Sequence, residues 1–96
     1  MMNKTIVQEL SQEVVNLMKE AYYKKLGMEN LLRVKESVDD SDLIKMGELT
    51  AQYEDLGFSI ARKALEENQG ISAEDANIES WSVDFIDSKV AVTYSV

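Results

Sequence analysis

The sequence predicts an α+β domain in which N-terminal helices carry a C-terminal β-hairpin. Two observations support this fold class. Residues 81–96, WSVDFIDSKVAVTYSV, alternate apolar and polar side chains with the period-two pattern of half-buried strands. Most of the preceding chain instead repeats its apolar residues at steps of three and four, as an amphipathic helix does. We expect one domain over 1–96, because 96 residues provide no material for a second core.

The first helix is predicted over about 5–26. Thr5 and Gln8 have the spacing of a capping box, which would satisfy two backbone N–H groups at a helix start. The apolar residues that follow at helical spacing are Val7, Leu10, Val14, Leu17, Met18, Ala21 and Tyr22. Gly27 is placed to end this helix in a left-handed turn.

Two further helices are predicted after Gly27. The shorter covers about 28–38 and ends at a run of short polar side chains that begins with Asp39, because such side chains favour caps over helix interiors. The longer covers about 42–68, and Gly70 ends it.

Gly47 and Gly57 lie inside the longest predicted helix. Each costs about 1 kcal/mol relative to alanine in a helix interior, so a packing contact is expected at both positions. Because Ala61 lies one turn after Gly57, the second glycine leaves room for another helix to approach closely, either from this subunit or from its neighbour.

The hairpin is predicted over about 80–96. A two-residue turn at 87–88, or a four-residue turn from 86 to 89, gives the same facing pairs: Phe85 with Val90, Val83 with Val92, and Trp81 with Tyr94. All six side chains then lie on one face, which must be covered by the helices.

A hairpin with two unpaired edges invites pairing with a second copy. The candidate self-association residues are Trp81, Val83, Val92 and Tyr94. We therefore expect a homodimer or a higher oligomer, with docking of the hairpin inside a monomer as the alternative.

The composition argues against catalysis. The chain contains neither cysteine nor histidine, which removes thiolate nucleophiles, cysteine-ligated zinc and the commonest general base. It also lacks a phosphate-binding glycine loop and any spacing typical of metal ligands. The cluster from Asp39 to Asp42 lacks the glycine and the closing glutamate of a calcium loop. We expect no enzyme activity, no catalytic residues, no metal and no cofactor.

Hydropathy favours a cytoplasmic protein that does not enter a membrane. No apolar run approaches the roughly 18 residues of a membrane span. The first ten residues also lack the apolar core of a signal peptide.

The net charge of −8 is concentrated in the middle of the chain. Residues 1–38 carry six basic and five acidic side chains, whereas residues 39–80 carry three basic and eleven acidic ones. Such a field repels nucleic acid and attracts basic surfaces, although a solvated face that keeps the protein soluble is the plainer interpretation. The candidate partner-binding residues are Asp39, Asp40, Asp42, Glu48, Glu54, Asp55, Glu66 and Glu67.

Residues 21–35 place aromatic rings beside cations, the combination that a nucleotide or another phosphorylated ligand requires. The candidate ligand residues are Tyr22, Tyr23, Lys24, Lys25 and Arg33. An ordinary solvated surface is the competing interpretation.

The leading functional hypothesis is a non-enzymatic acidic module that occupies a basic surface of a partner protein. Small inhibitors, immunity proteins and accessory proteins of mobile elements act in this manner, and no motif links the chain to any of them. The alternatives are a small-ligand protein that uses the aromatic and basic residues, and a structural subunit of an oligomeric assembly.

Overall fold

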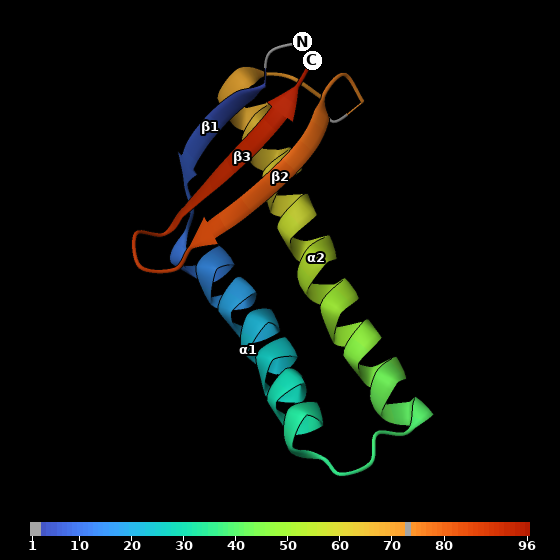
Figure 1. The fold of residues 1–96 in the computed structure, drawn as a ribbon. Coiled ribbons are helices and arrows are strands. Elements are labelled where there is room, and N and C mark those ends of the chain that lie inside the picture. Colours follow the sequence, from blue (N-terminus) through green and yellow to red (C-terminus); the bar gives the residue numbers. More distant parts are fainter. Residues whose placement is uncertain (1–2, 73) are drawn as a thin grey trace.

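In the computed structural model, which describes residues 3–72 and 74–96, a three-stranded antiparallel sheet packs on a hairpin of two long helices (Figure 1). The elements in chain order are β1 (Lys4–Glu9), α1 (Gln12–Val34), α2 (Asp40–Gln69), β2 (Asn77–Asp84) and β3 (Lys89–Ser95). The predicted α+β class and the C-terminal hairpin are confirmed.

The predicted helix start near residue 5 is wrong, because residues 4–9 form β1. The β-branched residues Thr5, Ile6 and Val7 suit a strand, and β3 offers a free edge with which they pair. The first helix begins at Gln12 instead. Ser11 caps it, and its hydroxyl oxygen accepts the Val14 N–H at 3.3 Å.

The predicted break at Gly27 is also wrong. Helix α1 runs through this glycine to Val34, so the predicted helices over 5–26 and 28–38 are largely one element. The sequence on both sides favours continuation: Lys25 and Glu29 form a 3.0 Å ion pair that spans the glycine. The chain leaves the helix at Lys35, which is extended.

Helix α2 confirms the longest predicted helix within two residues at its start and one at its end. Asp39 and Asp42 form a reciprocal capping box: each carboxylate accepts the backbone N–H of the other, at 2.9 and 3.2 Å. Gly70 ends the helix with a φ of 65°, as predicted.

Strand β3 is the centre of the sheet, with β1 on one side and β2 on the other. Val83 faces Val90 and Trp81 faces Val92, so the predicted register is wrong by two residues. The Asp84 carboxylate accepts the N–H groups of residues 86 and 87 at 2.9 and 3.1 Å, which fixes the turn earlier along β2 than predicted.

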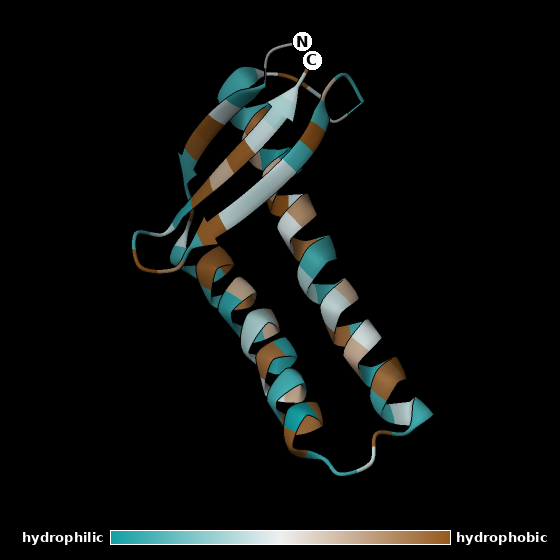
Figure 2. Cartoon of the chain, viewed as in Figure 1, coloured by the Kyte–Doolittle hydropathy of each residue, from teal (hydrophilic) through white to brown (hydrophobic). Residues whose placement is uncertain are grey.

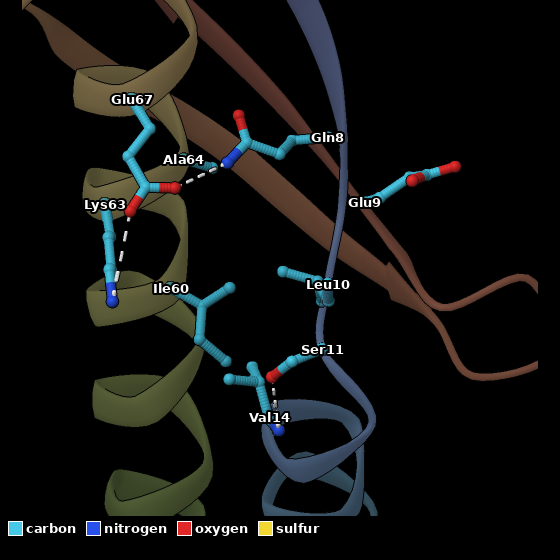
Figure 3. Close-up of a pocket in the computed structure, with 9 residues that line it drawn as sticks. All are labelled: Gln8, Glu9, Leu10, Ser11, Val14, Ile60, Lys63, Ala64 and Glu67. Carbon is cyan, nitrogen blue, oxygen red and sulfur yellow. Dashed lines mark hydrogen bonds and ion pairs between the residues drawn. The ribbon is translucent and has the colours of Figure 1, made fainter.

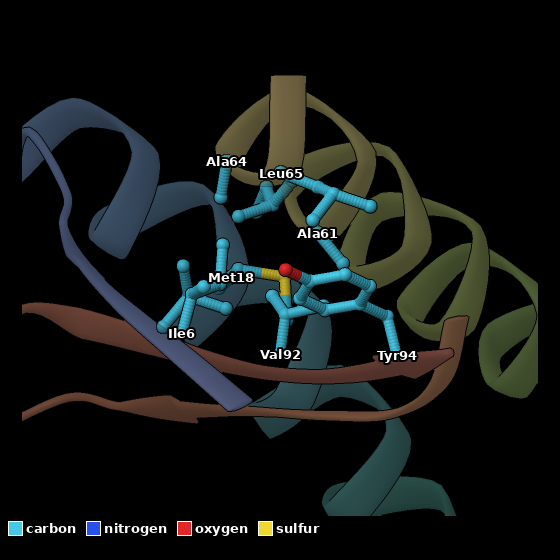
Figure 4. Packing of buried hydrophobic residues seen from close by; sticks show 9 residues of the cluster. Ile6, Met18, Ala61, Ala64, Leu65, Val92 and Tyr94 are labelled. Carbon is cyan, nitrogen blue, oxygen red and sulfur yellow. The ribbon is translucent and has the colours of Figure 1, made fainter. Parts of the chain in front are cut away.

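The two-residue shift leaves each side chain on its predicted face, because strand faces alternate with period two. The apolar face of the hairpin is therefore the covered one, as predicted. Figure 4 shows Val92 and Tyr94 rising from the sheet toward α2. The buried residues of this core are Ile6, Met18, Ile60, Ala61, Ala64, Leu65, Val90, Val92 and Tyr94.

Gly57 has the close packing contact that its position predicted, but the partner is a strand and not a helix. The indole of Trp81 lies directly on this glycine, so a methyl group at Gly57 would overlap the ring. Gly47 does not have the predicted contact, because no atom of the described residues would lie within 4 Å of its added Cβ.

Candidate functional site

Both helices extend beyond the sheet as a helical arm, which we define as residues 24–52 (Figure 1). Within the described part of the chain, the core and the side chains packed against it include no residue of this arm. Leu49, 8% exposed, is its most buried large side chain. Met28, Leu32 and Met46 are half-buried. The arm is therefore held together by one thin apolar seam.

Large apolar side chains are exposed where the two helices of the arm are joined. Figure 2 shows apolar positions on the last turn of α1 and the first turns of α2, beyond the sheet. We define the apolar tip as Val34, Val38, Leu43 and Ile44, which are 77, 42, 58 and 62% exposed. A cluster of this kind is typical of a surface that contacts another molecule.

The acidic residues at the start of α2 mainly stabilise the arm itself. The Ser41 hydroxyl and the Asp42 N–H donate to Asp39, and these hydrogen bonds lower the pKa of its carboxyl group. Asp42 also lies 2.6 Å from Lys35, and this hydrogen bond raises the pKa of the lysine. Two of the predicted partner-binding residues, Asp39 and Asp42, are thus already engaged within the chain.

The remaining predicted acidic residues fall into two groups. Glu67 accepts a 2.8 Å hydrogen bond from the Gln8 amide. The others make no side-chain hydrogen bond or ion pair with the described residues and are exposed: Asp40, Glu48, Glu54, Asp55 and Glu66. Glu48, Asp55 and Glu66 recur after two and then three helical turns, so they follow one acidic line about 27 Å long on α2.

The predicted ligand residues do not converge. Tyr22 and Lys25 both contact Tyr53 of α2, with 5.8 Å between the ring centroids and 5.6 Å from the Lys25 Nζ to the ring. Lys24 pairs instead with Glu20 at 3.2 Å.

Tyr23 and Arg33 complete the predicted ligand set. Tyr23 is 59% exposed beside Tyr22, and Arg33 lies in the last turn of α1. Helical spacing places neighbouring residues about 100° apart around α1, which separates the members of this set.

The aromatic rings near Tyr22 connect the arm to the sheet. Tyr22 contacts Phe85 at 5.7 Å, and Tyr53 contacts Trp81 at 5.5 Å between centroids. Partial burial raises the pKa of Tyr53. Tyr53 was missed by sequence reasoning, because no local spacing links it to a ring 31 residues earlier. These contacts indicate a structural role, in which the four rings hold the two helices against the sheet.

The proposed self-association residues are divided between two strands. Val92 and Tyr94 are buried on β3, whose two edges pair with β1 and β2. Trp81 and Val83 are half-buried on β2. One edge of the predicted hairpin is therefore filled by the chain's own N-terminal strand.

A small hollow of about 210 Å³ lies between α2 and the corner where β1 meets α1 (Figure 3). Leu10, Val14 and Ile60 form part of its apolar wall. At its rim, Gln8 and Lys63 both point toward Glu67. These three polar side chains therefore pair with one another, and the volume of the hollow is below that of most ligand pockets.

Among residues 3–72 and 74–96, no group of three or more carboxylates is arranged to hold a metal ion. None of the helices in these ranges has the length and apolar character needed to cross a membrane. Comparisons with protein-family models, curated proteins and solved structures gave no match to this chain.

Proposed function

We propose that the protein is a cytoplasmic, non-enzymatic binding module that docks its helical arm on a basic surface of a partner protein. The observation that carries the proposal is the apolar tip, whose four side chains remain 42–77% exposed in the described chain. Burying a valine, leucine or isoleucine side chain contributes about 1.5–3 kcal/mol, so a complementary cleft would bind this tip.

The charge of α2 supports a basic partner. Helix α2 carries seven acidic and three basic side chains, a balance of −4, whereas α1 carries three acidic and four basic ones, a balance of +1. Asp40 lies beside the apolar tip, and Glu48 begins the acidic line about two turns later. Such charges mainly increase the association rate and exclude acidic competitors, and both effects weaken with salt.

The lowered pKa values of two carboxyl groups do not favour general acid catalysis by either of them. The pKa of Asp39 and that of Asp84 are both lowered by hydrogen bonds to the carboxylate. A carboxyl group that acts as a general acid near neutral pH needs the opposite shift.

The test is affinity capture with the full chain at low and high salt. We compare wild type with a tip variant, Val34→Ser with Ile44→Ser, and a charge variant, Glu48→Gln with Asp55→Asn. The control is Val7→Ser, which removes a side chain of comparable exposure (57%) from the sheet, outside the arm.

We expect a partner that wild type and the Val7→Ser control retain equally. High salt and the charge variant should each reduce its retention, and the tip variant should abolish it. Capture that is insensitive to both the tip and the charge variants, or that is lost only in the control, would refute the arm as the binding surface.

A further inference from the structure

The helical arm contains an open groove of about 380 Å³ between α1 and α2. Its lining residues include Leu31 and the buried Leu49, with Lys24 and Lys45 as its basic members. Gly27 keeps the groove open on the α1 side, because an added Cβ there would meet no described atom within 4 Å.

The other half of α1 presents the complementary features. Leu17 is 54% exposed although it lies within the helix, and it shares a shallow depression with Glu13 and Glu20. One helix thus carries an exposed apolar side chain between two acids. Ten residues after Leu17, or about 15 Å along the axis, Gly27 has no side chain and lies in the groove that Lys24 and Lys45 line.

These features follow one seam of α1. Successive steps of three and four residues connect its members, which is the spacing of a helix-pairing seam: Glu13, Leu17, Glu20, Lys24, Gly27 and Leu31. We call this set the α1 seam. It excludes the apolar tip and the acidic line.

We propose that the α1 seam is the interface between two copies of this chain, with their α1 helices antiparallel across a two-fold axis. An axis that passes between Glu20 and Lys24 seats Leu17 of each copy over Gly27 of the other. The same axis brings Glu20 of each copy to Lys24 of the other.

Charge complementarity identifies a second copy as the occupant. The acidic half of each seam meets the basic groove of the other copy, and a two-fold axis forms each contact twice. Within one copy Lys24 lies 3.2 Å from Glu20, and both side chains are more than half exposed. In the dimer the two pairs form one alternating cluster.

The proposed contact also explains the glycine in the middle of α1. Glycine costs about 1 kcal/mol relative to alanine in a helix, and no contact with residues 3–72 or 74–96 requires it at position 27. Any side chain there would occupy the space that Leu17 of the second copy enters. This inference is independent of the proposed function, because it uses a different surface.

The first test is sedimentation equilibrium of the full chain over a range of concentrations. We expect wild type to dimerise and Gly27→Leu to weaken dimerisation at least tenfold. The thermal stability of this variant should be kept or increased, because the position is open and leucine favours helix. A wild type that stays monomeric at millimolar concentration, or a variant that dimerises as wild type does, would overturn the proposal.

The second test reverses the charges. Glu20→Lys and Lys24→Glu should each weaken dimerisation at least tenfold, and the double variant should restore it. Glu79→Lys, the same charge reversal at an exposed position of β2 outside the arm and the seam, is the control and should leave the dimerisation constant unchanged. A failure of the double variant to restore dimerisation would contradict the pairing of Glu20 with Lys24.

The third test measures the register directly. Because the sequence contains no cysteine, only the introduced cysteines can form a disulfide. A mixture of Leu17→Cys and Gly27→Cys chains should form a disulfide on mild oxidation, because the proposed axis brings these positions together. Leu17→Cys alone should not, since its two copies would lie about 15 Å apart, beyond disulfide reach. Disulfide-linked Leu17→Cys homodimers, without the mixed disulfide between Leu17→Cys and Gly27→Cys chains, would overturn the antiparallel arrangement.

Discussion

The part of the helices beneath the sheet and the arm beyond it share two helices but differ in how their side chains are covered. Under the sheet, Ala61, Ala64 and Leu65 of α2 are at most 2% exposed. In the arm, Leu49 is 8% exposed, and Ile44, five residues earlier, is 62% exposed. Along α2, the apolar side chains thus change from fully buried at Leu65 to mostly exposed at Ile44, about six turns away.

The two regions are therefore stabilised by different means. The sheet half depends on apolar burial, whereas the arm depends mainly on local helix contacts: the capping box of α2 and the ion pairs Lys25–Glu29 and Lys35–Asp42. Segments with few buried apolar contacts open locally at lower free energy than the core. A binding surface that must adapt to a partner is expected in such a segment.

The largest expected effect compares the same substitution in both regions. Leu65→Ala should reduce the free energy of unfolding by about 2–5 kcal/mol, because it leaves a cavity in a closed core. Leu49→Ala should cost less, since the surrounding arm can relax or open. Urea denaturation followed by circular dichroism measures both. Equal losses would show that the arm and the sheet half form one cooperative core.

A smaller loss is expected at the contact that joins the two regions. Gly57→Ala should destabilise the protein by about 1–3 kcal/mol, even though alanine favours helix, because its methyl group overlaps the Trp81 ring. The chain has a single tryptophan, so its fluorescence reports on this contact directly. An unchanged emission spectrum together with an unchanged midpoint would contradict the close contact.

The features that depend on local pattern could be predicted from the sequence. Alternation identified the apolar face of the hairpin, and Gly70 identified the end of α2. The strand at 4–9 could not be predicted in the same way. Its β-branched residues suit a strand, but the same six residues also fit a helical spacing, and pairing with the edge of β3, 80 to 90 residues later, selects the extended form.

The site was less predictable than the fold. The sequence indicated an excess of acidic residues on α2, but not that Asp42 would bind Lys35 or that Glu67 would bind Gln8. The apolar tip was missed, because its residues continue the same periodicity as the buried ones. Only the length of the sheet relative to the helices decides which of these residues are covered.

A stabilising substitution sharpens the contrast with Gly57. Gly47→Ala should raise the stability of the arm by about 0.5–1 kcal/mol, because the added methyl group enters open space and alanine favours helix. Hydrogen exchange should slow at amides of the arm, while those of β3 change little. Faster exchange in the arm, or equal slowing in β3, would contradict the assignment of Gly47 to an independent, loosely packed segment.

The smallest expected effect is a pH dependence confined to the arm. The hydrogen bonds from Ser41 and from the Asp42 N–H hold the pKa of Asp39 below its usual 3.8. A lowered carboxyl pKa stabilises the folded state above pH 3.8, and this contribution is lost as the pH falls through the lower, folded-state value.

Asp39→Asn keeps an oxygen that can cap α2 but removes the titrating charge. Protection factors of the first-turn amides of α2 should therefore fall more steeply with acid in wild type than in this variant, with the difference confined to pH values below about 3.8. Asp84→Asn is the matched change in the hairpin turn, because N–H groups of Asp87 and Ile86 lower that pKa as well. It should alter acid sensitivity in the turn and leave α2 unchanged, because the N–H groups bound to Asp84 belong to residues 86 and 87 and not to α2. A response of both segments to either substitution would instead show that the capping box and the hairpin turn belong to one cooperative unit.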